Sequence, residues 1–323
     1  MNINQICPKH NTALNIDRIQ NGYQCQYGCF FPIINEIPRF VPQGNYAASF
    51  GLQWNKFRTT QLDSFSGLSI SKDRLTRLAG GTLDVFKGKD VLEAGCGAGR
   101  FTEIMLAAEA NVFAADLSEA VEANYKNCNK FKNYFVCQAD LLHLPVLQEK
   151  FDIVVCIGVI QHTPDPEATM TALCSHVKPG GLLIIDHYAY GYPATPVRRI
   201  LRSVLLKTSK SFSMQFCQLL TLALWPIHKG LWKIKKIPAA NRLRSKFLKL
   251  SPLVDYHDAY PQLGPKLMRE WSMLDTHDTL TDVYKHLRSA EEIEMHLFDC
   301  GMTDIKTAYA GNGVEASSKR PIL

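Results

Sequence analysis

The segment Asp90 to Thr102 reads D-V-L-E-A-G-C-G-A-G-R-F-T and constrains the fold more than any other part of the chain. A short apolar run with an acidic residue is followed by three glycines, Gly95, Gly97 and Gly99, and then by a helix-like stretch. Glycine adopts positive φ and has no Cβ, so a ligand can approach such a turn closely, and the next helix offers free backbone N–H groups. The pattern predicts a strand, a tight turn and a helix around a nucleotide-like ligand.

Strand-length apolar runs recur along the middle of the chain, separated by helix-like stretches. This alternation favours a parallel sheet with helices on both faces. Near the C-terminus, a helical pattern over 289–300 begins with a capping box of Ser289 and Glu292, and a G-N-G hairpin signal follows. We therefore expect an antiparallel hairpin to close the sheet. The predicted strands are Asp90–Leu92, Val112–Ala115, Tyr134–Gln138, Ile153–Ile157, Leu182–Ile185, Asp304–Ala310 and Val314–Ser318.

Three acidic side chains around this turn indicate the ligand. Asp116 ends the next strand, where its carboxylate can accept hydrogen bonds from two ribose hydroxyls, and Asp140 follows the third strand, where it can accept from an adenine amine. Each could instead cap a helix N-terminus. Glu93 precedes the glycines, so it would repel a pyrophosphate but attract the ammonium group of an amino acid. An adenosine joined to an amino acid is S-adenosylmethionine.

Five successive segments resemble the motifs of class I S-adenosylmethionine-dependent methyltransferases, in order and across Asp90 to Asp186. They are L-E-A-G-C-G-A-G-R, A-A-D-L-S, Q-A-D-L-L-H-L-P, F-D-I-V-V-C-I-G-V-I-Q-H-T-P-D-P and V-K-P-G-G-L-L-I-I-D. The resemblance implies an α/β fold, a Rossmann-like, doubly wound, seven-stranded sheet whose last strand is antiparallel. It also implies a set of cofactor contacts. These are the methionine tail at Glu93, Gly95 and Gly97, with Cys96 and Gly99 in the same loop, the ribose at Asp116, the adenine near Leu117, Asp140 and Leu141, and a cofactor-facing backbone at Cys156 and Ile157.

Two short N-terminal knuckles, C-P-K-H and C-Q-Y-G-C, predict a metal site. Cys7, His10, Cys25 and Cys29 supply three thiolates and an imidazole, the number that a closed tetrahedral zinc site needs. A closed set leaves no position for water, so we expect a structural zinc in a segment too short to build its own core. The alternative is four unrelated side chains. The next residues, F-F-P-I-I-N-E-I-P-R-F, resemble zinc-ribbon-like modules that precede some methyltransferases, although His10 stands where that pattern more often has cysteine.

Methyl transfer to a hydroxyl needs an aligned acceptor and a base. His162, just after the fourth predicted strand, is the first candidate, although a capping or packing role would explain it equally well. His187 and Tyr188, beyond the fifth strand, are the next candidates, with a structural role at a strand end as the alternative. The segment Tyr46 to Gly67 resembles the pre-core segment of similar bacterial methyltransferases, and its aromatic residues predict either core packing or contacts to cofactor or substrate from Trp54, Arg58 or Gln61.

The predicted organisation has five parts: a zinc-ribbon-like module (1–42), a connecting helical segment (43–88), the cofactor-binding core (89–186), a basic helical insertion (187–288) and the closing helix and hairpin (289–323). The net charge is +6, and no acidic residue occurs between Asp186 and Asp255. Within the insertion, the uncharged run 211–228 is broken by glutamines and a proline, and it falls short of the roughly 20 apolar residues of a spanning helix. We expect a substrate lid that is apolar toward the site and cationic toward its surroundings, with the apolar residues Phe212, Phe216, Leu219, Leu220, Leu224 and Trp225.

These features predict a methyltransferase for a small-molecule, lipid-linked or glycosylated acceptor, with peripheral contact to an anionic membrane. The elements N-P-P-Y and P-C, typical of adenine and cytosine methylation, do not follow the fourth strand. A ribosomal RNA methyltransferase is the enzymatic alternative, because basic charge suits RNA. A non-catalytic adaptor with a relic fold is another. The N-terminus lacks the basic start and apolar stretch of a signal peptide, and the mean hydropathy is −0.10, so we expect a cytoplasmic protein that can bind peripherally to a membrane.

Overall fold

The computed structural model describes residues 4–42 and 44–322, which form two compact units. The first, here called the core unit, comprises the described residues up to Arg58 together with Ser69–Tyr192 and those from Tyr284 onward. The second, the helical unit, comprises Thr59–Leu68 and Pro193–Val283. The helical unit thus takes in residues of the predicted connecting segment as well as most of the predicted insertion.

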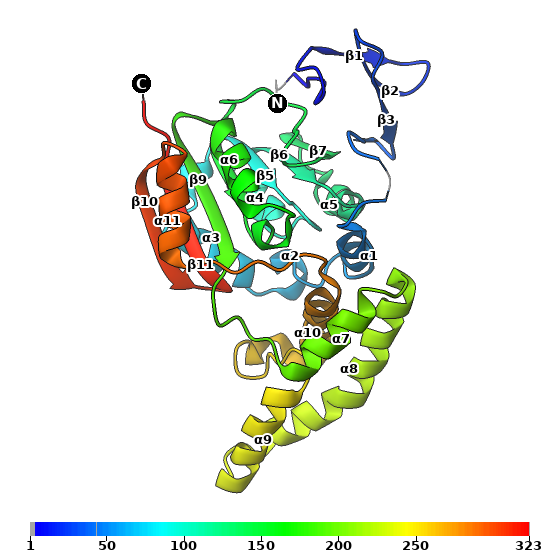
Figure 1. The fold of residues 1–323 in the computed structure, drawn as a ribbon, viewed down its shortest axis with the longest axis vertical. Helices are drawn as coiled ribbons and strands as arrows, with labels where there is room; N and C mark the ends of the chain where they lie inside the picture. Colours follow the sequence, from blue (N-terminus) through cyan, green and yellow to red (C-terminus); the bar gives the residue numbers. More distant parts are fainter. Residues whose placement is uncertain (1–3, 43, 323) are drawn as a thin grey trace. The chain divides into compact units, whose positions relative to one another are not determined.

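A seven-stranded sheet forms the centre of the core unit (Figure 1). Its spatial order is β10-β11-β9-β8-β5-β6-β7, in which β5 to β9 run parallel and β11 runs antiparallel to both neighbours. The sheet has the seven strands and the reversed last strand that the resemblance implies. The strands are β5 (Asp90–Ala94), β6 (Asn111–Asp116), β7 (Tyr134–Gln138), β8 (Phe151–Cys156), β9 (Val177–Tyr188), β10 (Thr303–Ala310) and β11 (Gly313–Lys319).

The hairpin β10–β11 is joined by the predicted turn. Ala310 pairs with Gly313, so the loop consists of Gly311 and Asn312 alone, and Gly311 has a positive φ of 56°. Two-residue hairpin turns favour glycine and asparagine because they require such backbone angles. The hairpin lets β11 pair with β9, where Glu315 lies opposite Asp186.

Helices cover both faces of the sheet, as the alternating pattern predicts (Figure 1). Successive strand residues point to opposite faces, so Val91 packs into one hydrophobic layer and Leu92 into the other. The first layer includes α3 (Ile70–Leu78), α4 (Thr102–Ala107) and α5 (Ala120–Cys128), and the second includes α6 (Pro166–His176) and α11 (Ala290–Asp299). The capping box of α11 is confirmed: Ser289 Oγ accepts from Glu292 N, and Glu292 Oε2 accepts from Ser289 N.

A small antiparallel sheet at the N-terminus packs on the core unit. Its strands are β1 (Leu14–Asp17), β2 (Gly22–Cys25), β3 (Phe30–Ile34) and β4 (Ile37–Pro38). After β4, Phe40 N donates to the carbonyl of Gln138 at 2.8 Å, and the Arg39 guanidinium forms an ion pair with Glu122 of α5. Phe31 and Phe40 share one hydrophobic cluster with residues 141–146. This module therefore has no separate core, in line with its predicted shortness.

The helical unit contains α2 (Asp63–Ser66), α7 (Pro196–Leu205), α8 (Lys210–Lys233), α9 (Pro238–Leu250) and α10 (Gly264–Thr281), with a 3-10 turn at Pro261–Leu263. Trp271 Nε1 donates to the carbonyl of Thr60 at 2.8 Å, which joins 59–68 to α10. Among the described helices, none has the length and apolar character needed to cross a membrane. Of the residues predicted for the apolar face of the lid, Trp225 is buried while Phe212 and Leu219 are 51% and 66% exposed, and the direction of this face relative to the site stays a prediction.

Candidate cofactor and acceptor site

The three glycines after β5 all adopt the positive φ that the sequence predicts, at 80°, 48° and 94° for Gly95, Gly97 and Gly99. A Cβ on Gly95 would overlap the side chain of Val159, and one on Gly99 would lie 3.0 Å from Cys128 Sγ. Protein packing therefore explains the missing side chains at these two positions, where the sequence analysis invoked a ligand. At Gly97 the nearest group is the indole of Trp54, 3.4 Å from the position of a Cβ.

Asp116, the last residue of β6, bonds to the glycine loop. Its Oδ2 accepts from Gly97 N at 2.9 Å, and its Oδ1 accepts from the backbone N and hydroxyl of Ser118. Burial raises the pKa of this carboxyl, partly offset by the hydrogen bonds from Ser118 and Gly97. The Asp116 side chain thus stabilises the turn before α5, a local role like the predicted capping alternative. It also stabilises the glycine loop, which the sequence analysis assigned to the cofactor.

Glu93 lies within β5 and is buried. Burial raises its pKa to about 8, although the hydroxyl of Thr102 donates a hydrogen bond to Glu93 Oε2 and acts in the opposite direction. Without a cation beside it, this carboxyl is mostly protonated at neutral pH. The negative charge that the sequence analysis assigned to Glu93 therefore forms only when a partner such as an ammonium group stabilises it.

The predicted adenine side of the site has three residues with different environments. Asp140 is 41% exposed and accepts from Leu142 N at 3.0 Å, which makes a local turn. The Leu117 carbonyl accepts from Asn45 Nδ2 and Gln138 Nε2, at 2.8 and 2.9 Å. The side chain of Leu141 belongs to the hydrophobic cluster under the N-terminal module.

Tyr46 is a residue that the sequence analysis missed at this side. Burial, followed by the charges of Asp140 and Asp116, raises the pKa of its phenol. Its ring packs edge-on against Tyr284, with centroids 5.2 Å apart. The sequence signal that could have pointed to Tyr46 is its position as the first residue of the segment Tyr46 to Gly67.

The three candidate contact residues of the segment Tyr46 to Gly67 lie in different places. Trp54, in α1 (Ala48–Lys56), covers Gly97, whereas Arg58 bonds to the side chain of Asn127. Asn127 in turn donates to the carbonyl of Ala98 at 2.7 Å, so Arg58 supports the glycine loop indirectly. Gln61 belongs to the helical unit, where it donates to Asp275. Cys156 and Ile157, at the end of β8, are buried.

His162 and Tyr188 come together beyond the carboxyl ends of β8 and β9. His162 ends the 3-10 turn Ile160–His162, its ring lies edge-on to Tyr188 with centroids 5.3 Å apart, and Phe50 packs on it at 5.2 Å. His162 Nδ1 lies 3.2 Å from the carbonyl oxygen of Tyr284. A carbonyl only accepts, so Nδ1 carries the proton and Nε2 the lone pair.

His187 lies apart from this pair, because neighbouring residues in a strand point to opposite faces. Its Nδ1 donates to the carbonyl of Tyr188 at 2.9 Å, and burial lowers its pKa to about 4. It is therefore neutral at physiological pH and is a weaker base than an ordinary histidine. The structure does not bring His187 and His162 into one catalytic pair.

Three polar side chains in or near the 3-10 turn Ile160–His162 have buried atoms without a hydrogen-bond partner in the described part of the chain. They are both amide atoms of Gln161, Nε2 of His187 and Nε2 of His286. His286 N donates to the carbonyl of Gln161 at 2.9 Å, and the charge of His286 also acts on His187. Buried polar atoms are rarely left unpaired, so these mark a place where a polar ligand or water fits.

The sequence between the middle of β5 and the end of β9 matches a known family. Residues 92–185 match the family described as "Methyltransferase domain". These residues form a methyltransferase domain. The glycine loop, Asp116, His162 and β8 all lie inside the matched range of this domain, whereas the N-terminal module and the helical unit lie outside it.

Curated relatives of the methyltransferase domain include two proteins named ubiquinone biosynthesis O-methyltransferase. That of Coxiella burnetii is 34% identical over 103 residues, which are 31% of this chain and 44% of the relative. That of Aromatoleum aromaticum is 37% identical over 98 residues, 29% of this chain and 42% of the relative. The chain thus spans less than half the length of these relatives.

A solved structure similar to this chain is magnesium protoporphyrin IX methyltransferase from Synechocystis PCC 6803 with bound SAH. The identity is 15%, the TM-score is 0.43, and the similarity covers 85% of this chain and 96% of that protein.

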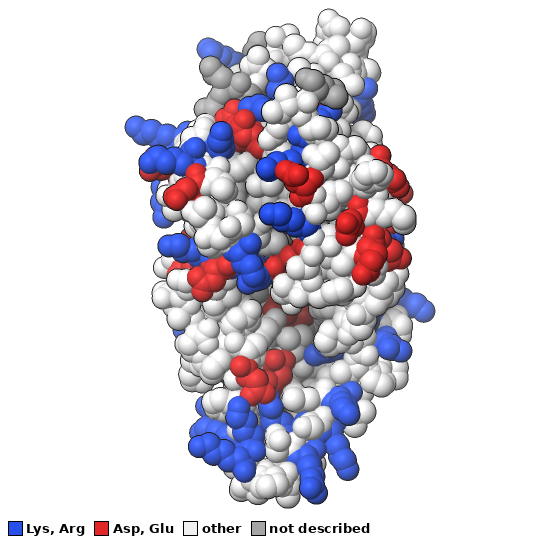
Figure 2. Space-filling model, turned by 90° about the vertical axis from the view of Figure 1, so that its left-hand side faces the viewer, with Lys and Arg blue, Asp and Glu red and all other residues white. Residues whose placement is uncertain are grey.

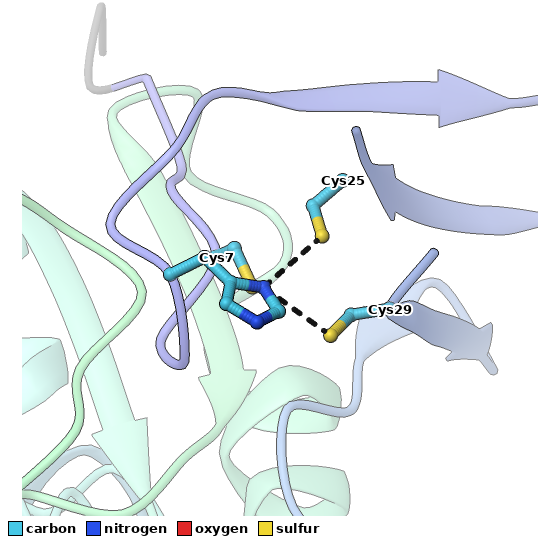
Figure 3. Close-up of side chains that lie close together, drawn as sticks. Cys7, Cys25 and Cys29 are labelled. Carbon is cyan, nitrogen blue, oxygen red and sulfur yellow. Dashed lines mark hydrogen bonds between the residues drawn. The ribbon is translucent and has the colours of Figure 1, made fainter. Parts of the chain in front are cut away.

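Outside the methyltransferase domain, the four predicted metal ligands lie together in the N-terminal module. The thiol sulfurs of Cys7, Cys25 and Cys29 each lie 3.6 Å from Nδ1 of His10, and all four atoms lie within 4.8 Å of one another (Figure 3). Burial raises the pKa of Cys25, but hydrogen bonds from His10 and from the backbone of Cys29 and Tyr27 outweigh it and bring the pKa to about 6. A thiolate is therefore available for a metal at neutral pH.

Proposed function

We propose that this protein transfers the methyl group of S-adenosylmethionine to a hydroxyl of a small-molecule, lipid-linked or glycosylated acceptor. One observation carries the proposal. The glycine loop and His162 follow the carboxyl ends of β5 and β8, and Asp116 and Tyr188 are the last residues of β6 and β9, so all lie at the edge where ligands of open α/β sheets bind. The names of the curated relatives support a hydroxyl acceptor.

In this proposal the chain holds the cofactor with the loop Gly95–Cys96–Gly97 and Gly99, and with Glu93 at the amino-acid end. Asp116 and Leu117 hold the ribose side, Asp140 and Leu141 the adenine side, and the backbone of Cys156 and Ile157 faces the cofactor. Tyr46 joins this set, because the charges of both Asp140 and Asp116 act on its phenol. When bound, the sulfonium supplies an electrophilic methyl group.

His162 is the proposed base. Its Nδ1 donates to the Tyr284 carbonyl, which keeps the lone pair on Nε2, the atom that can take the hydroxyl proton as the new O–C bond forms. Phe50 and Tyr188 pack on the imidazole and hold its plane. The unpaired atoms of Gln161, His187 and His286 would bind polar groups of the acceptor, which gives His187 a binding role in place of a basic one.

We also propose that Cys7, His10, Cys25 and Cys29 hold a structural zinc. A tetrahedral zinc with Zn–S of about 2.3 Å and Zn–N of about 2.0 Å places sulfur and nitrogen about 3.6 Å apart. The three Sγ to Nδ1 distances of 3.6 Å fit that geometry. Four protein ligands leave no open position, so this metal would stabilise the module and take no part in methyl transfer.

The test is an incubation of the purified protein with cofactor labelled in the methyl group. Parallel arms contain a small-molecule extract, a lipid extract and undermethylated ribosomal RNA. Base-stable label in a small molecule or lipid supports the proposal, because a methyl ether resists mild base, whereas base-labile label would indicate a methyl ester on a carboxyl group. Label in RNA alone would establish the ribosomal RNA alternative, and failure of S-adenosylhomocysteine to bind in calorimetry would favour a non-catalytic adaptor.

A further inference from the structure

Helix α8 leaves several large apolar side chains exposed, while its buried side is half polar. Phe212, Leu219, Leu222, Ile227 and Ile234 are 51%, 66%, 63%, 46% and 46% exposed. Successive residues of a helix are about 100° apart, so the four positions within α8 fall on one face of the helix, which is about 36 Å long, and Ile234 follows directly after its end. We call these five residues the apolar stripe. The opposite, buried side carries three apolar and three polar residues: Met214, Cys217, Trp225, Ser213, Thr221 and His228.

Polar contacts fix this orientation of α8. His228 Nδ1 lies 2.6 Å from Asp255 Oδ2, and His228 Nε2 lies 2.8 Å from Ser251 Oγ. Arg244 of α9 also forms an ion pair with Asp255. Rolling α8 to bury its apolar stripe would break the two contacts of His228 and remove one partner of the largely buried Asp255 carboxylate, which is unfavourable. The exposed stripe is therefore a stable feature of the helical unit.

The helices on either side of α8 in the sequence add apolar and basic residues to the surface. Ile200 and Val204 of α7, and Leu243 and Leu250 of α9, are each more than half exposed. Basic side chains gather over the lower end of Figure 2, where α9 lies in Figure 1. The exposed basic residues of 193–250 are Arg199, Lys207, Lys210, Lys233, Lys235, Lys236, Arg242, Lys246 and Lys249.

We propose that this surface of α7, α8 and α9 binds an anionic lipid bilayer, with the stripe of α8 inserted at the level of the headgroups. A bilayer offers an apolar interior and negative charge together, which are the two properties that this surface complements. A second copy of the chain would bring the same cations against each other, because residues 187–254 contain no acidic side chain. RNA would satisfy the cations but leave the apolar stripe in water. The inference does not depend on the proposed methyl transfer.

The test is cosedimentation of the full chain with vesicles of phosphatidylcholine alone and of phosphatidylcholine mixed with phosphatidylglycerol. We expect sedimentation with the anionic vesicles and little with the neutral ones. The combined variant Leu219→Glu, Leu222→Glu, Ile227→Glu should need at least about tenfold more anionic lipid for half-maximal binding. Its three side chains are exposed, so its melting temperature and circular dichroism should match the wild type.

A matched control is Phe298→Glu, an equally drastic change at a 71% exposed position of α11 in the core unit, which should leave lipid binding unchanged. Wild type that remains in the supernatant with anionic vesicles would overturn the inference. So would equal binding of the triple variant. A wild-type dimer that the triple variant converts to monomer, without lipid binding, would assign the stripe to protein contacts, and salt-sensitive RNA binding without lipid binding would assign the surface to nucleic acid.

Discussion

Asp116 at the end of β6 accepts a hydrogen bond of 2.9 Å from the backbone N–H of Gly97 in the loop after β5. The same carboxylate bonds to Ser118 before α5, so one side chain joins two neighbouring turns at the carboxyl edge of the sheet. In the proposed cofactor complex, Asp116 would act twice, through direct contact with the ribose and through the conformation of Gly97.

Replacing Asp116 with alanine should weaken S-adenosylhomocysteine binding by about 2 to 4 kcal/mol, because charge-assisted hydrogen bonds are lost. Asp116→Asn keeps the shape and should lose less. Calorimetry measures both. Asp304→Ala, at a 64% exposed position of β10, is the control and should bind as the wild type does. Full affinity in Asp116→Ala would exclude Asp116 from the cofactor site.

Gly95→Ala should destabilise the core unit more than Gly80→Ala. Both glycines have positive φ, at 80° and 86°, so both substitutions introduce backbone strain of about 1 to 2 kcal/mol. Only at Gly95 does the new methyl group also overlap Val159. The double variant Gly95→Ala, Val159→Ala should therefore recover part of the loss in a urea titration. No recovery would mean that packing against Val159 is not what demands glycine there.

Much of the core followed from the sequence, because its signals are local. Alternating apolar runs predicted the strands, G-N-G predicted the turn of the hairpin, and Ser289 with Glu292 predicted the start of α11. The grouping of Cys7, His10, Cys25 and Cys29 also followed from the sequence, because the two knuckles limit the possible partners, while their role as zinc ligands stays a prediction.

What sequence could not supply depends on distant contacts. The reason for Gly95 lies in Val159, 64 positions later, and the charges that act on the Tyr46 phenol come from Asp116 and Asp140, which are far from it in the sequence. Periodicity identifies an apolar face on α8 but not which side packs within the helical unit. The contact of His228 with Asp255 shows which side of α8 packs there.

Glu93 should make the free protein less stable as pH rises. Its pKa is about 8 in the folded chain and near the ordinary value of a glutamate in the unfolded one, so the folded state holds the extra proton between these values. Relative to Glu93→Gln, which mimics the protonated form, the wild type should lose up to about 1.4 kcal/mol per pH unit from pH 5 to 8. Urea titrations at four pH values measure the difference. A constant difference would mean that Glu93 is ionised throughout.

His162→Gln should lower kcat by about 10² to 10⁴, because the base is lost, while cofactor affinity stays the same. Tyr188→Phe keeps the ring that packs on His162 and should have a small effect. His143→Gln, at a 65% exposed position, is the control. The pH profile of kcat separates the roles: loss of the acidic limb in His162→Gln indicates a base, and an unchanged profile indicates a packing role.

Removing the metal should affect more than the N-terminal module. We expect one zinc per chain in elemental analysis, and Cys29→Ser should reduce it strongly, because one of four ligands is lost. Phe31 and Phe40 of the module share a hydrophobic cluster with Leu141 and Leu144, which follow Asp140 on the proposed adenine side. The variant should therefore unfold at a lower temperature and bind S-adenosylhomocysteine more weakly. Cys300→Ser, a cysteine outside the ligand set, should retain zinc and affinity. Zinc loss with unchanged affinity would show that the module does not support residues 140–144.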